Sequence, residues 1–265
     1  MSNGNPVSSD GQPGWRGVST RRAFLNHLGL SATIVGAVCG VIFFIWYPAP
    51  YFDIKGAWNV LRVLIGVDLV VGPLMTLILF RPGKRGLAID VTMIAMIQLS
   101  ALLYGTSMIF QERPYYVVFA VDRIEVLAKR DVDAAAVAGT AFENKPLVGP
   151  LLAFASVPSD PVEFQRLLEE TLFEGKPDIE RRPDRWRAYA ESKNAILARA
   201  EPLSTLLEQR PDTAEEISRV SRDLGMDPAE IFYLPVIGGD RALTLVIDPE
   251  TALPLKALDF SPWAS

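Results

Sequence analysis

Cysteine and histidine are nearly absent from this chain, which has one of each among its 265 residues. Cys39 lies inside a long apolar stretch, so disulfides cannot hold a folded domain together and packing alone must do so. His27 lies at the edge of the same stretch, which leaves no histidine elsewhere for a Ser-His-Asp or Cys-His arrangement and no His/Cys cluster for zinc. We therefore expect a protein that is not an enzyme and that has no metal and no cofactor.

Charged residues are scarce in three stretches of the first 110 residues, at about residues 24–46, 58–80 and 87–110. Each stretch has some twenty residues, and at a helical rise of ~1.5 Å per residue each spans a hydrocarbon core of ~30 Å. These stretches predict three transmembrane helices. The fold class that we expect is a membrane protein with a three-helix transmembrane bundle, residues 19–110, followed by an α+β extracytoplasmic domain, residues 111–265.

The Gly-, Ser-, Pro- and Asn-rich N-terminus, residues 1–18, has little to pack and is predicted to be a disordered cytoplasmic segment. The charge of the remaining chain is uneven. Up to residue 110 there are 8 Lys/Arg against 4 Asp/Glu, and from residue 111 onward there are 18 against 27. The acidic C-terminal part argues against nucleic acid as a partner.

Basic residues on short connections orient a membrane protein, because Lys and Arg stay on the cytoplasmic side. Those that set the predicted topology precede the first stretch or lie between the second and third: Arg21, Arg22, Arg81, Lys84 and Arg85. The first connection carries only Lys55, opposed by Asp53. The N-terminus and the second connection are therefore predicted to be cytoplasmic, and everything after residue 110 is predicted to lie outside the cytoplasm.

An alternative interpretation of the N-terminus is a cleaved export signal. Residues 19–25 resemble a twin-arginine signal, and residues 36–39 weakly resemble a lipoprotein cleavage box. We favour an uncleaved first helix, because the apolar stretch continues to Trp46 and no small-x-small cleavage site follows it.

Asp68 is the residue of the second stretch whose burial in lipid costs the most free energy, because it lies where a bilayer is driest. We therefore expect this carboxyl group to have a specific role. Gln98 lies at a similar depth in the third stretch, ~15 Å from the boundary by helical rise. We predict a contact between the two residues. One interpretation is that this contact does no more than join the helices. The other is that Asp68 offers a polar contact to the transmembrane helix of another protein. The sequence leaves both interpretations open.

Three further residues of the apolar stretches are candidates for a role. Pro73 removes a backbone hydrogen bond, which frees the carbonyl of Leu69 and predicts a kink beside Asp68. Arg62, near the outer interface, is expected to extend its charged end toward the headgroups. Asp90, one turn inside the inner boundary, is expected to form an ion pair with the basic second connection.

Residues 111–265 contain both strand and helix patterns. Enrichment in Val, Tyr and Phe predicts a strand over residues 115–127, and an apolar run predicts a second strand over residues 147–157. Asp160 is predicted to cap a helix that begins at Pro161. Its spacing predicts a core face of Phe164, Leu167, Leu168, Thr171 and Leu172.

The rest of this region predicts two more helices and the closing strands. One helix is predicted to follow Asp184, with one side lined by Trp186, Tyr189, Ala190 and Leu197. Another covers residues 212–224 and ends at Gly225. Strands are predicted at residues 231–237, 242–247 and 252–258. Pro254 cannot donate to a ladder, so the last strand is predicted to lie at a sheet edge.

Short segments of distinctive composition occur along the chain: Trp46-Tyr47-Pro48-Ala49-Pro50, Gly66-Val67-Asp68, Gly72-Pro73-Leu74 with Thr76, Phe80-Arg81-Pro82-Gly83-Lys84, Tyr104-Gly105, Val121-Asp122-Arg123, Tyr233-Leu234-Pro235 and Pro262-Trp263. On these segments the chain resembles the type IV pilin accessory proteins of the TfpX/TfpZ kind, from about residue 20 to residue 263. The segments in the apolar stretches are the most specific, whereas residues 134–230 match only in outline.

The resemblance implies an inner-membrane accessory protein, or chaperone, of a Gram-negative bacterium that stabilises a cognate type IV pilin and assists its assembly into pili. It places the C-terminal domain in the periplasm, and it implies the lipid bilayer and the transmembrane helix and globular head of the pilin as partners. A membrane enzyme that modifies pilin and a membrane-anchored periplasmic sensor remain the alternatives. The sequence indicates no oligomeric state.

Overall fold

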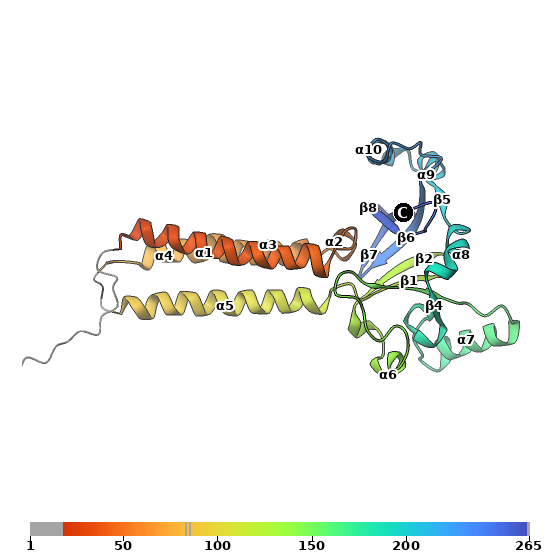
Figure 1. Ribbon diagram of the computed structural model, residues 1–265, viewed down its shortest axis with the longest axis horizontal. Coiled ribbons are helices and arrows are strands. Elements are labelled where there is room, and N and C mark those ends of the chain that lie inside the picture. Colours follow the sequence, from red (N-terminus) through yellow and green to blue (C-terminus); the bar gives the residue numbers. More distant parts are fainter. Residues whose placement is uncertain (1–17, 83, 85, 264–265) are drawn as a thin grey trace, which may run out of the picture. The chain divides into compact units, whose positions relative to one another are not determined.

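The computed structural model describes residues 18–82, 84 and 86–263 (Figure 1). The N-terminal segment that was predicted to be disordered lies outside the described residues, apart from Val18. The chain divides into two compact units. The helical unit comprises Met1–Val38 and Leu61–Thr106, and the sheet unit comprises Cys39–Val60 and Ser107–Ser265.

Among the described residues, three helices are long and apolar enough to cross a membrane: Thr20–Trp46, Trp58–Leu79 and Leu87–Gln111. They confirm the predicted stretches to within a few residues. Two of them contain a wider π-helical segment. The first consists of α1 (Thr20–Val41) and η2 (Ile42–Trp46). The second consists of α3 (Trp58–Gly66), η3 (Val67–Val71) and α4 (Gly72–Leu79), and the third is α5 (Leu87–Gln111).

The outward faces of the helical unit are apolar. Leu30, Val63 and Ile97 are 62%, 67% and 65% exposed, whereas Asp68 and Gln98 are 5% and 9% exposed. A water-soluble bundle has the opposite arrangement, because water stabilises polar surface and not apolar surface. This distribution is compatible with a lipid environment.

The sheet unit is built on a mixed sheet, which in the described part of the chain has the strand order β4-β3-β1-β2-β6-β7-β8, with β5 paired to β6. The pairs β1–β3 and β2–β6 are parallel, and the other pairs are antiparallel. The strands are β1 (Tyr116–Ala120), β2 (Arg123–Leu127), β3 (Leu151–Ala155), β4 (Trp186–Ala188), β5 (Glu201–Pro202), β6 (Phe232–Gly238), β7 (Arg241–Ile247) and β8 (Pro254–Leu258). This α+β architecture confirms the predicted fold of the region.

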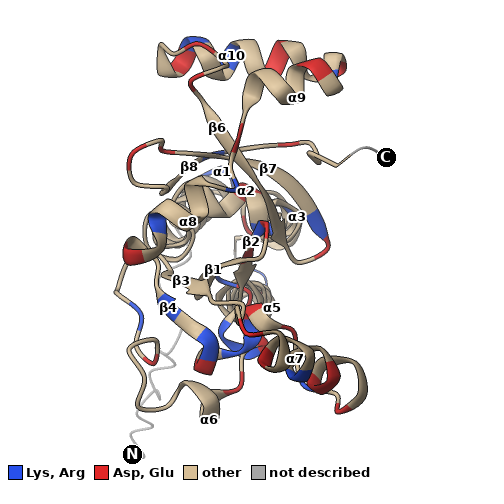
Figure 2. Ribbon diagram, turned by 90° about the vertical axis from the view of Figure 1, so that its right-hand side faces the viewer, with Lys and Arg blue, Asp and Glu red and all other residues tan. Residues whose placement is uncertain are grey.

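Both faces of the sheet are buried. Along β1, Val117 and Phe119 enter one apolar cluster, whereas Tyr116, Val118 and Ala120 enter another. The alternation follows from the pleat, which points successive side chains to opposite faces. The helices that cover the sheet are α6 (Ala134–Val137), α7 (Pro161–Phe173), α8 (Lys193–Leu197), α9 (Leu203–Gln209) and α10 (Ala214–Leu224). Figure 2 shows acidic and basic positions interleaved along α7 and α10.

Several predicted ends and edges are confirmed. The side chain of Asp160 accepts the backbone N–H groups of Val162 and Glu163, so it caps α7 as predicted. Helix α10 ends at Gly225, which has the left-handed conformation at φ 67°. Strand β8, which begins at Pro254, is the last strand in the sheet order.

The predicted strand over residues 115–127 is in fact a hairpin. Strands β1 and β2 pair antiparallel, and Val121 and Asp122 form the turn between them. Val121 has a φ of 60°, a conformation that glycine adopts more easily than a β-branched residue. The sequence contains no glycine or asparagine at this position, which is why the turn was missed.

The predicted helix after Asp184 is wrong. Residues Trp186–Ala188 form β4, and the α-helix that follows, α8, begins only at Lys193 after a 3-10 turn at Ala190–Ser192. The ring of Trp186 packs against Tyr116 and Phe142, with ring centroids 5.0 and 5.3 Å apart. Pairing with β3 and this aromatic packing override the local helical pattern.

The predicted core face of α7 is wrong in part. Only Leu167 and Glu170 of this helix are buried, whereas Phe164, Leu168 and Leu172 are exposed. Together with Leu167, these side chains line an open groove of about 340 Å³ between α7 and the β1–β2 turn. The amphipathic pattern correctly predicts a helix, but most of the apolar face of α7 is left uncovered by the rest of the sheet unit.

Candidate functional site

The second long helix is irregular beside Asp68, where the backbone carbonyl of Asp68 has no donor within its own helix. In an α-helix the carbonyl of Asp68 accepts the N–H of Gly72, and in a π-helix it accepts the N–H of residue 73. Here the N–H of Gly72 donates to the carbonyl of Val67, five residues back. Residue 73 is proline, which has no N–H. The carbonyl of Asp68 therefore receives neither of its helical donors.

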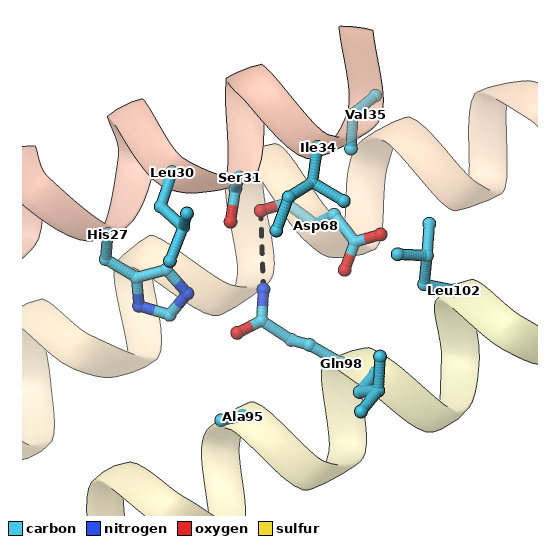
Figure 3. Close-up of a pocket in the computed structure, with 10 residues that line it drawn as sticks. His27, Leu30, Ser31, Ile34, Val35, Asp68, Ala95, Gln98 and Leu102 are labelled. Atoms are coloured by element: carbon cyan, nitrogen blue, oxygen red, sulfur yellow. Dashed lines mark hydrogen bonds between the residues drawn. The ribbon is translucent and has the colours of Figure 1, made fainter. Parts of the chain in front are cut away.

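Gln98 of α5 supplies the missing donor. Its Nε2 donates to the backbone carbonyl of Asp68 at 3.4 Å (Figure 3). The structure thus brings the two residues together, as the sequence predicts, but through the peptide group of Asp68. The carbonyl that receives a donor from a neighbouring helix is that of Asp68, one residue before the carbonyl of Leu69 that the sequence pointed to.

Gly72 makes this approach possible. If Gly72 carried a Cβ atom, that atom would lie 1.9 Å from Nε2 of Gln98 and 2.3 Å from its Cδ, both far inside contact distance. Only glycine therefore leaves room for the amide. Directly after it, Pro73 is buried at the start of α4.

A pocket of about 130 Å³ opens beside these residues, and we call it the Asp68 pocket. It is lined by His27, Leu30, Ser31, Ile34, Val35, Asp68, Ala95, Gln98, Leu99 and Leu102. The carboxyl group of Asp68 lies among these lining residues (Figure 3). Its Oδ2 is buried and has no hydrogen-bond partner among the described residues. A buried acceptor without a donor is costly, because it has lost its hydration and gained nothing in return.

His27 is a residue of this site that sequence reasoning missed. Its Nδ1 forms a hydrogen bond with Oγ1 of Thr76, whose hydroxyl donates to the carbonyl of Gly72 at 3.2 Å. The available signal was the spacing of His27, Ser31 and Val35, which places them on one face of α1.

The remaining sequence-predicted residues lie outside the pocket. The ammonium group of Lys84 donates to the carboxylate of Asp90, so the predicted ion pair is present. Arg62 is exposed on α3. The basic residues that set the predicted topology are exposed where described, namely Arg21, Arg22, Arg81 and Lys84, whereas Arg85 lies outside the described residues. Within the described ranges, no three His, Cys, Asp or Glu side chains are grouped to hold a metal ion.

The segment between the first two long helices belongs to the core of the sheet unit, which the sequence did not indicate. Helix α2 (Tyr51–Lys55) places Tyr51 and Ile54 in one apolar cluster with residues of β6 and β7. Gly238 of β6 packs directly against Ile54, since a Cβ atom added at Gly238 would lie 2.5 Å from Cγ2 of Ile54. The guanidinium of Arg241 donates to the carbonyl of Asp53 at 2.6 Å.

Comparison with known proteins finds relatives of one kind. The family model described as Fimbrial assembly protein FimB matches residues 16–56. The fimbrial assembly protein of Dichelobacter nodosus serogroup I is 34% identical over 226 residues, which cover 83% of this chain and 87% of that protein. The serogroup E1 protein is 33% identical over 226 residues, which again cover 83% of this chain and 87% of that protein. The protein of serogroups C1 and C2 is 44% identical over 108 residues, 40% of this chain and 82% of that protein. No solved structure matches.

Proposed function

The chain belongs to the family of fimbrial assembly proteins, and from this premise we propose that it is a non-enzymatic accessory protein, a chaperone that stabilises a cognate type IV pilin and assists its assembly into pili. The family membership agrees with the resemblance to pilin accessory proteins that the sequence showed. The observation that carries the proposal is the identity over 226 residues, which extends through both the helical unit and the sheet unit.

The layout of the chain supports this function. A pilin that awaits assembly has one transmembrane helix and a globular head outside the cytoplasm. A chaperone for it needs a membrane part and an external folded part in the same orientation. Three helices of sufficient length and an α+β unit provide both parts.

We place the protein in the inner membrane, with the N-terminus in the cytoplasm and the sheet unit in the periplasm. The basic residues before α1 and between α4 and α5 support this orientation, because such residues stay on the cytoplasmic side. A reporter that is active only in the cytoplasm, fused to the C-terminus, is expected to be inactive. Activity of that reporter contradicts the proposed orientation.

The outer edge of β8 is the part of the sheet unit that we assign to the globular head of the pilin. No strand in the described part of the chain pairs with this edge, and Leu255 is exposed on it. A free edge offers backbone donors and acceptors to an added strand. Crosslinking groups at Leu255 are expected to label the pilin, whereas groups at Leu147, exposed elsewhere in the unit, are not.

Deletion of the gene tests the function itself. We expect the cells to lose pilin, or pili, or both, and we expect the wild-type gene to restore them. The mass of any remaining pilin is expected to be unchanged, because a chaperone leaves no modification. Normal amounts of pilin and pili in the deletion strain refute the proposal, and a mass change that depends on the gene favours the modifying enzyme.

A further inference from the structure

One oxygen of the Asp68 carboxyl group, Oδ2, forms no hydrogen bond that joins the helices of the helical unit among the described residues. The hydrogen bond between the second and third long helices uses the backbone carbonyl of Asp68, and Gln98 donates to it. An alanine at position 68 presents the same carbonyl. This hydrogen bond therefore explains the amide at position 98 but not the oxygen Oδ2 of Asp68, which has no partner among the described residues.

Burying an acid without a donor costs free energy, so the presence of Asp68 in the pocket needs an explanation. Asp68 is 95% buried by its own unit, and Oδ2 has no partner among the residues that the structure describes. An ionised carboxylate only accepts hydrogen bonds, and a protonated one still leaves an oxygen that accepts. Either form is stabilised by a donor brought from outside the unit.

The walls of the Asp68 pocket indicate what kind of molecule can bring the donor. Its rim contains Leu30, Ile34 and Leu99, which are exposed apolar side chains on α1 and α5. Its interior contains Asp68, Ser31 and the amide of Gln98 (Figure 3). A lipid chain fits the rim but carries no donor. A helix with an apolar surface and one polar side chain matches both parts.

We propose that the Asp68 pocket binds the transmembrane helix of the pilin through one hydrogen-bond-donating group on that helix, a hydroxyl, an amide or an ammonium group, which reaches the Asp68 carboxyl. This inference rests on the proposed function. The pocket volume of about 130 Å³ suits one short side chain, since it equals roughly four waters at ~30 Å³ each. The site is selective because only a helix with a donor at the matching depth provides a partner for Oδ2 of Asp68.

Recovery of pilin with variant proteins from detergent tests the chemistry. We expect Asp68→Leu, which removes the acceptor, to lower the recovered pilin about tenfold, and Asp68→Asn, which keeps one acceptor oxygen, to lower it less. A tenfold loss of binding corresponds to about 1.4 kcal/mol, which is the size of one hydrogen bond. Val70→Leu is the matched control, because Val70 is exposed on the same π-helical segment and does not line the pocket.

Photocrosslinking from two positions of α5 tests the location and does not depend on how Asp68 variants fold. A crosslinking residue at Leu99, on the pocket rim, is expected to label the pilin, and one at Met93, exposed on the opposite face, is not. Thermal unfolding of each variant in detergent shows whether lower recovery reflects loss of fold. If Asp68→Leu unfolds, the Leu99 crosslink in the otherwise unaltered chain decides.

The outcomes separate this inference from the proposed function. Pilin that is recovered equally with wild type and folded Asp68→Leu, or that is not labelled from Leu99, overturns the inference and leaves the proposed function standing. A Leu99 crosslink to a second copy of this chain, or to lipid only, also overturns it. Failure of the wild-type chain to recover or crosslink pilin from any position defeats the proposed function.

Discussion

At the scale of single residues, Gly72 and Pro73 act on the same site in different ways. Pro73 withholds the N–H that the carbonyl of Asp68 needs, and Gly72 leaves the space through which Gln98 delivers a replacement. Neither effect depends on the carboxyl group of Asp68. The two residues therefore organise the contact between the helices through the backbone of Asp68, and Oδ2 of its carboxyl group has no partner among the described residues.

Gly72→Ala is expected to separate Gln98 from Asp68. The new Cβ occupies the position of the amide nitrogen, so the amide must swing away and the carbonyl of Asp68 loses its donor. We expect a loss of about 1 kcal/mol in the free energy of unfolding in detergent, a typical value for an interhelical hydrogen bond. Gly66→Ala is the control, since a Cβ at Gly66 meets nothing within 4 Å. Equal effects of the two substitutions contradict this account.

Glu170 on α7 is expected to make stability depend on acidic pH. Hydrogen bonds from Arg182 at 2.6 Å and Lys176 at 3.0 Å lower the pKa of this carboxyl from 4.5 to about 2. A lowered pKa in the folded state contributes stability above pH 4.5, and that contribution is lost as the pH falls toward 2. Glu170→Gln should therefore have a lower Tm than wild type at pH 7, and the difference should shrink below pH 4.5. A difference that is constant with pH argues against this ion pair.

At the scale of elements, the helices with the strongest local signals were predicted best. The three long apolar helices follow from length and hydropathy alone, and the caps of α7 and α10 follow from Asp160 and Gly225. The β1–β2 turn was missed because it contains no glycine or asparagine, and β4 was missed because pairing and aromatic packing with distant residues decide it. Asp68 and Gln98 were found because polar residues are rare in apolar stretches, whereas His27 was missed because its partner, Thr76, is 49 residues away.

Two neighbouring leucines on α7 should respond differently to truncation. Leu167 is 7% exposed and belongs to a core cluster, whereas Leu168 is 43% exposed on the open groove. Leu167→Ala is expected to cost about 2–3 kcal/mol in the free energy of unfolding, and Leu168→Ala about 0.5 kcal/mol or less. Chemical unfolding of both variants provides the measurement. Comparable losses would mean that the groove is closed in solution.

At the scale of the whole molecule, the connection between the first two long helices is a structural part of the sheet unit. Tyr51 and Ile54 pack with β6 and β7, and the hydrogen bond from Arg241 to Asp53 joins residues 188 positions apart. No local pattern in the sequence indicates this packing, because the residues that bury Ile54 all lie far along the chain, in β1 and β2 and in β6 and β7. Residues 16–56, which match the fimbrial assembly family model, include this connection.

Ile54→Ala is expected to destabilise the sheet unit strongly. The side chain is fully buried, and its removal leaves a cavity against Gly238 and the surrounding strands. We expect a loss of about 3–4 kcal/mol in the free energy of unfolding. Leu147→Ala, a truncation of similar size at an exposed position of the same unit, should be nearly neutral. Proteolysis and thermal unfolding of the purified chain check both, and an unaffected Ile54→Ala variant rules out the assigned role of α2.

The burial of Ile54 also fixes when this protein can finish folding. A ribosome synthesises residues 51–54 early and residues 232–247 late, so the early segment must wait for nearly all of translation before the last of its neighbours exist. Until then its apolar side chains stay partly uncovered. A product shortened by a premature stop keeps them uncovered permanently, and proteases that recognise such surfaces have a direct means to remove it.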